Sequence, residues 1–205
     1  MPETAVTSAR LTRHSRATRV VHFGLAISVI VQLLTSLAMN AARSGHPEDT
    51  LFMLHEYSGL AALGFVLLFW LVVTVRRTGT ATARLLPWFS AGDRRLVWQD
   101  IRHHSLYLRR GALPPCDDAG PMASAIHGLG LLLMTLMAGL GTIWFALEVS
   151  GSAGQLAGAA IEVHKLFGNL AWAYLAGHTS LALLHHMCGE ARLRQMLSLR
   201  ATDVE

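Results

Sequence analysis

Histidine is the residue type in this sequence with the most chemical potential, because many copies lie where polar residues are rare. Of the eleven histidines, seven lie in or at the edge of a long apolar stretch: His22, His55, His127, His164, His178, His185 and His186. Ionisable residues at membrane depth are uncommon and usually functional. A neutral imidazole binds iron, copper or zinc, and it exchanges protons near neutral pH. These histidines therefore predict a metal-centred function.

The spacing of these histidines predicts two pairs at different depths. His164 and His178 are fourteen residues apart, so on a helix they lie within about 40° of one face and about 21 Å apart along the axis. His55 begins another apolar stretch at the depth of His164, whereas His22 lies in the region of His178. Imidazoles from opposite sides hold haem iron in b-type cytochromes. We therefore interpret the pattern as two haem sites, one in each leaflet.

The inner pair is less well defined by depth alone. Counted from the outer ends of the helices, His22 lies about 27 Å deep, between His178 at about 21 Å and His185 at about 31 Å. Both remain candidates for its partner. His127, His185 and His186 gather at this inner edge and could serve a quinone site, because quinone reduction consumes protons. Hydrogen bonds to carbonyl groups or to haem propionates are the alternative role.

Two glycines and two arginines are further candidates for haem packing. Gly59 and Gly168 each lie four residues after a histidine of the outer pair, on the same helix face. Glycine there leaves room for a flat macrocycle, although small residues also let helices approach closely. Arg16 and Arg19 precede His22 and could pair with haem propionates. Membrane topology alone could also account for these arginines.

Four apolar stretches must position these residues. The chain is 52% hydrophobic and 15% charged, against about a quarter charged in soluble domains. The stretches cover about 20–40, 55–75, 123–147 and 164–187, and each is long enough to cross a bilayer as a helix. We expect an all-α, integral membrane four-helix bundle that forms a single cytochrome domain over residues 1–205.

The distribution of basic residues predicts the orientation of the bundle. Arginines are concentrated in the N-terminal segment, in the connection 76–122 and in the C-terminal tail, while the other two loops hold only Arg43, with Lys165 at the start of the last span. The positive-inside rule therefore places both termini and the long connection in the cytoplasm. Residues Leu96 to Arg110 could form an amphipathic helix on the anionic inner leaflet, or a solvated basic loop. Because the charges border apolar stretches, we expect membrane lipid and no nucleic acid as a partner.

At this level the chain resembles the bacterial cytochrome b561 family and, more broadly, the b-type cytochrome subunits of hydrogenases and formate dehydrogenases. The resemblance spans roughly Arg16 to Leu197. It rests on V-V-H-F around His22, on H-E-Y-S-G-L at His55, and most strongly on V-H-K-L-F-G-N-L-A-W-A-Y-L-A-G-H-T-S-L-A-L-L-H-H from Val163 to His186. It implies a multi-pass protein of the bacterial inner membrane that binds two haem b groups. The implied ligand pairs are His22 with His178 and His55 with His164.

The chain departs from the family pattern in two places. Phe23 stands where many relatives have Trp, and the connection 76–122 is longer than in the shortest members. The longer connection resembles the subunit-type cytochromes and leaves the redox partner open.

Three functions follow from these observations. The first is electron transfer between the quinone pool and a redox partner, such as a partner subunit, on the outer side. The second is superoxide:ubiquinone oxidoreduction, but the outer loops and span ends carry two basic against five acidic residues, a poor surface for attracting an anion. The third is histidine-based metal transport, which would usually also need carboxylates or thiolates at depth. The sequence leaves open whether the protein is an enzyme that acts on quinone or only an electron carrier.

Overall fold

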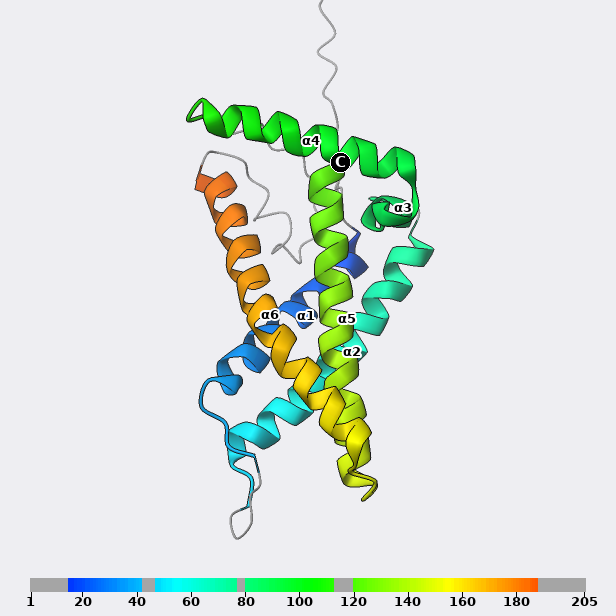
Figure 1. Cartoon of the computed structure of the whole chain (residues 1–205), viewed down its shortest axis with the longest axis vertical. Coiled ribbons are helices and arrows are strands. Elements are labelled where there is room, and N and C mark those ends of the chain that lie inside the picture. The colour runs from blue at the N-terminus through cyan, green and yellow to red at the C-terminus, as the bar shows by residue number, and fades with distance from the viewer. Residues whose placement is uncertain (1–14, 42–46, 77–79, 113–119, 188–205) are drawn as a thin grey trace, which may run out of the picture.

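The computed structural model describes residues 15–41, 47–76, 80–112 and 120–187 (Figure 1). All regular elements in these ranges are helices, which confirms the expected all-α class. They are α1 (Arg16–Ser36), α2 (Thr50–Val75), α3 (Thr82–Leu85), the 3-10 helix η1 (Pro87–Phe89), α4 (Ala91–Arg109), α5 (Pro121–Val149) and α6 (Gln155–Met187). Each of the four predicted spans therefore corresponds to one long helix.

Three of the long helices, α1, α2 and α5, are long and apolar enough to cross a membrane. Helix α6 has 33 residues but is not among these three. Polar side chains such as Asn169, His178 and Thr179 lower its mean hydropathy. The structure thus supports a helical membrane protein, whereas the fourth span and the side of the termini remain predictions.

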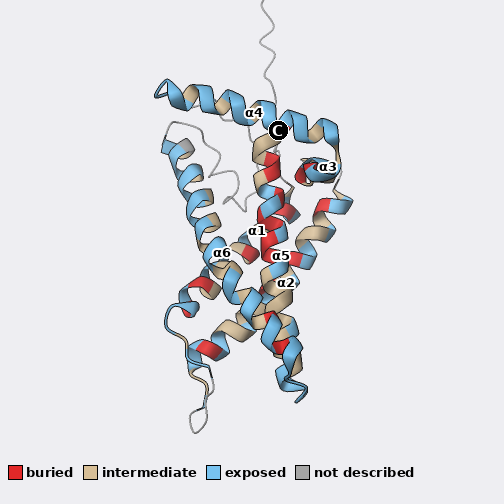
Figure 2. Cartoon of the chain, in the orientation of Figure 1, coloured by how far each residue is buried: buried red, intermediate tan, exposed pale blue. Residues whose placement is uncertain are grey.

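The long helices pack in the order α1, α2, α5, α6, each against the next. A cluster of buried apolar side chains joins them: Leu25, Leu33, Ala62, Val66, Leu133, Met134 and Ala171. Figure 2 shows buried residues along the facing sides of α1, α2 and α5, while α6 is mostly exposed or intermediate. Many large apolar side chains point outward from the bundle, as expected where lipid is the surrounding medium.

A capped turn fixes the start of α2, which carries His55. The Asp49 side chain accepts hydrogen bonds from the backbone N–H of Phe52 at 2.8 Å and from the backbone and side-chain amides of Asn40, both at 2.9 Å. The Asn40 side chain and then the Phe52 N–H hold the pKa of Asp49 below its ordinary value, because both favour the charged carboxylate. This N-cap ties the end of the first long helix to the start of the second.

Helix α4 lies across one end of the bundle, roughly perpendicular to α5 (Figure 1). It covers most of the stretch expected to form an amphipathic helix and begins earlier, at Ala91. Ser90 caps it by accepting the N–H of Asp93 at 3.3 Å. Val97 is buried, and the helix packs on α5 and η1. The guanidinium of Arg102 stacks over the Trp98 ring at 5.3 Å.

A glycine on α5 allows the connecting segment to touch the bundle. A Cβ added at Gly128 would lie 1.7 Å from the carbonyl oxygen of Leu85, the last residue of α3. Because that obstacle is backbone, rotation of a side chain cannot relieve it. Gly139 on the same helix has no neighbouring atom within 4 Å of its Cβ position, and this makes it a matched control.

We expect Gly128→Ala to destabilise the protein by about 1–3 kcal/mol through overpacking. Thermal unfolding in detergent should then show a lower midpoint, by about 2–4 °C for each kcal/mol. Gly139→Ala should leave the midpoint unchanged or raise it, because alanine favours a helix over glycine by about 1 kcal/mol. Equal midpoints for the two variants would contradict the close contact between α3 and α5.

Candidate functional site

His55 on α2 and His164 on α6 face each other at one level of the bundle. Their ring centroids are 6.3 Å apart and the ring planes meet at 81°. Both side chains are half-buried. The backbones of α2 and α6 make few close approaches, so the two imidazoles meet across a space that the main chains leave between them.

Each of these histidines has a hydrogen-bond partner at Nδ1, and the partner indicates which tautomer the ring adopts. The Thr35 hydroxyl donates to the carbonyl of Val31 at 2.7 Å, so at 2.9 Å from His55 Nδ1 it accepts the N–H of that nitrogen. His164 Nδ1 lies 3.0 Å from the carbonyl oxygen of Met137, which can only accept. Both rings therefore carry the proton on Nδ1, and each Nε2 keeps a lone pair for a ligand.

Gln32 on α1 lies at the same level of the bundle as His55. Its side-chain amide donates to the carbonyl of His55 and to the Ser58 hydroxyl at 2.7 Å. A Cβ at Gly59 would lie 3.4 Å from this amide, whereas nothing lies within 4 Å of the Cβ position of Gly168. The space beside Gly168 is therefore open, whereas the Gln32 side chain limits the space beside Gly59. A haem-packing role for these glycines stays a prediction.

A second histidine pair lies at the other level, between α1 and α6. The ring centroids of His22 and His178 are 6.4 Å apart, with the planes at 50°. Tyr174, one turn before His178, stacks on it at 5.5 Å with an interplanar angle of 10°. His127 on α5 contacts the same ring edge-on at 5.6 Å, and Phe69 lies 6.4 Å from His22. The structure thus brings together three of the predicted histidines, His22, His127 and His178.

The remaining candidate residues differ in how far they are buried. Arg19 is buried, with 6% of its surface exposed, whereas Arg16 is exposed. His127 is largely exposed. His186 has a buried Nδ1 with no hydrogen-bond partner in the described part of the chain. The side chain of His185 lies outside the described residues, so its predicted role stays untested.

The donor geometry of both pairs fits a haem iron held from two sides. An imidazole–metal bond of about 2 Å, with roughly 1 Å more to the ring centre, places two opposed rings about 6 Å apart. The observed centroid distances are 6.3 and 6.4 Å. Two opposed imidazoles form the ligand set expected of b-type haem. The residues present therefore fit this group.

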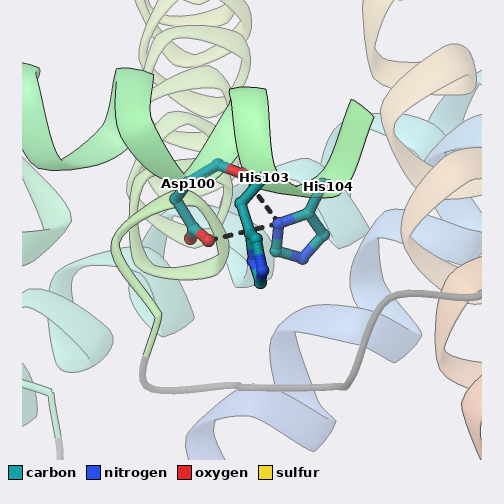
Figure 3. Close-up of side chains that lie close together, drawn as sticks. All are labelled: Asp100, His103 and His104. Carbon is teal, nitrogen blue, oxygen red and sulfur yellow. Dashed lines mark hydrogen bonds and ion pairs between the residues drawn. The ribbon is translucent and has the colours of Figure 1, made fainter. Parts of the chain in front are cut away.

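A cluster on α4 is not among the sites predicted from the sequence. Asp100, His103 and His104 each offer a ligand atom, and these atoms all lie within 4.8 Å of one another (Figure 3). The signal was present in the spacing, because residues three and four apart share a helix face. It was missed because the polar residues of this segment were attributed to membrane topology.

Comparison with known proteins supports the resemblance seen in the sequence. Residues 13–199 match the family described as prokaryotic cytochrome b561. No curated protein and no solved structure gives a significant match. The matched range contains α1, α2, α5 and α6 in full, and therefore all four histidines of the two pairs.

Proposed function

The chain belongs to the prokaryotic cytochrome b561 family of haem-binding membrane cytochromes, and we propose that it carries electrons across the bilayer between the quinone pool and an outer-side redox partner. The observation that supports this best is the presence of two opposed histidine pairs at two levels of one bundle. We assign one haem b to each pair. When bound, haem supplies a one-electron couple between ferric and ferrous iron.

The outer site rests on His55 and His164, with Nε2 of each directed to the metal. Thr35 and the Met137 carbonyl hold the opposite nitrogens, as partners of metal-bound histidines commonly do. These contacts orient the rings and strengthen them as ligands. A haem iron held by both of these imidazoles would keep no protein-free position for oxygen, so the pair would suit electron transfer.

The inner site rests on His22 and His178. The stacked Tyr174 ring restrains His178, and the 6.4 Å centroid distance supports His178 as the partner of His22. Arg19 is buried and lies three residues before His22. It is better placed than the exposed Arg16 to pair with a haem propionate.

A four-span arrangement in the bacterial inner membrane completes the proposal, with both termini and the connection 76–122 in the cytoplasm and one domain over residues 1–205. Helix α6 would be the fourth span. The polar residues that lower its mean hydropathy include His164 and His178, which face the other helices rather than lipid. Polar side chains in membrane helices usually face the bundle interior.

The inner end of the bundle is where we place quinone chemistry. His127 contacts His178, and His186 lies two turns further along α6; His185 adjoins it in the sequence. Reduction of a quinone takes up protons with electrons, and histidine is the side chain that exchanges protons near neutral pH. A partner subunit on the outer side would complete the electron path.

Replacing His164 by alanine tests the assignment of the haem ligands. We expect His164→Ala to lower the haem content of the purified protein from about two to about one per chain, because only the outer iron loses a ligand. A reduced-minus-oxidised spectrum and a haem assay measure this. Lys165→Ala, which removes an exposed neighbour, should keep both haems. Loss of both haems in His164→Ala, or of neither, would contradict the two separate pairs.

Replacing Thr35 by valine tests the hydrogen bond to His55. Without an acceptor for its Nδ1–H, His55 becomes a weaker donor to iron, the ferric state is less stabilised, and the midpoint potential of one haem rises. The expected shift is about 20–60 mV, from a hydrogen bond of about 0.5–1.5 kcal/mol. Spectroscopic redox titration measures it.

Thr179→Val is the matched control for Thr35→Val, because the Thr179 hydroxyl bonds only to carbonyls of its own helix. It should leave both potentials unchanged. An equal shift in both variants, or none in Thr35→Val, would show that Thr35 does not act on a haem ligand.

A further inference from the structure

A group of three ligand-bearing side chains lies on α4, apart from both histidine pairs. Asp100, His103 and His104 extend from the same side of the helix (Figure 3). Their ligand atoms all lie within 4.8 Å of one another. Helix α4 crosses the end of the bundle (Figure 1), whereas the proposed haem ligands come from α1, α2 and α6. The cluster is therefore not part of the haem sites.

Two of the three side chains are held in place by the fold. Asp100 accepts the backbone N–H of Met122 at 3.0 Å through Oδ2, which joins α4 to the first turn of α5. His104 Nδ1 lies 2.9 Å from the Asp100 carbonyl oxygen and 3.2 Å from Asp100 Oδ1. The side chains of His104 and Asp100 are only 21% and 18% exposed. Each can nevertheless still bind a metal. His104 has its other ring nitrogen, and the Asp100 carboxylate has further lone pairs.

His103 is the third member and is exposed. Its ring contacts Tyr107 edge-on at 5.1 Å and His104 at 6.2 Å. These contacts hold His103 on the same face of α4 as the other two residues. The hydrogen-bonded Asp100–His104 pair does not require it. The Arg102 guanidinium stacks over Trp98, so the nearest cation in the sequence is engaged elsewhere.

We propose that Asp100, His103 and His104 bind one divalent transition-metal ion of the zinc class, with water completing the coordination. One carboxylate and two imidazoles suit zinc, copper and nickel. Tetrahedral bonds of about 2 Å place ligand atoms roughly 3.3 Å apart. The ligand atoms, now within 4.8 Å of one another, would have to come closer on binding, and His103 is the exposed member of the three. The bound metal would fasten α4 to the start of α5 through Asp100.

Zinc binding to the haem-loaded full-length protein tests this site, because the haem irons then occupy the other histidine pairs. Isothermal titration in detergent should show one Zn²⁺ bound per chain. We expect His103→Ala and Asp100→Asn to weaken binding at least about tenfold. Asp93→Asn removes another carboxylate of α4 outside the cluster and should bind like the wild type. Equal zinc affinity in the wild type and His103→Ala would overturn the proposal.

Copper provides a second readout that a purely structural role would not change. The electron paramagnetic resonance spectrum of one bound Cu²⁺ should show coupling to two nitrogens in the wild type and to one in His103→Ala. An unchanged nitrogen pattern would overturn the site. Because Asp100→Asn also alters the contact with Met122, His103→Ala is the decisive variant, provided that its haem content and helicity match the wild type.

Discussion

The need to satisfy imidazoles inside an apolar bundle is the constraint on which the rest of this structure depends. A buried polar nitrogen without a partner destabilises the fold. His55 and His164 each satisfy one nitrogen, through Thr35 and the Met137 carbonyl, and the centroids of their rings lie 6.3 Å apart. A haem iron held between the rings, as proposed, would satisfy both remaining nitrogens at once. The Asp49 cap and the Gln32 hydrogen bonds fix the helix that presents His55.

The positions of the long helices were predictable because the bilayer sets the length of an apolar stretch. Their ends were less predictable. Helix α2 begins at Thr50 rather than near residue 55, because Asp49 caps it, and α6 begins at Gln155 rather than near residue 164. An apolar stretch marks only what can lie in hydrocarbon. The helix continues beyond it wherever caps and backbone hydrogen bonds permit.

The outer pairing of His55 with His164 was predictable from the helical period, because it sets both face and depth, whereas depth alone left His178 and His185 open as the partner of His22. The hydrogen-bond partners of His55 and His164 were not predictable. A backbone carbonyl such as that of Met137 leaves no mark in the sequence, and Thr35 is one hydroxyl among several in the apolar stretches. The contact of His127 with His178 depends on how α5 packs on α6. The α4 cluster did have the i, i+3, i+4 spacing of residues that share a helix face. The arginines around it, however, indicate membrane topology, and this explained the polar character of the segment without a metal site.

The proposed pair of haems would explain why α6 packs on α5 but makes few backbone contacts with α1 and α2. Among the long helices it packs extensively only on α5. Its histidines nevertheless meet rings from α1 and α2 at 6.4 and 6.3 Å. A group held between these rings adds contacts that the backbones do not make. A ligand that binds only the folded state adds its binding free energy to stability. In the proposed two-haem protein, the position of α6 would therefore be coupled to occupancy of both sites through His164 and His178.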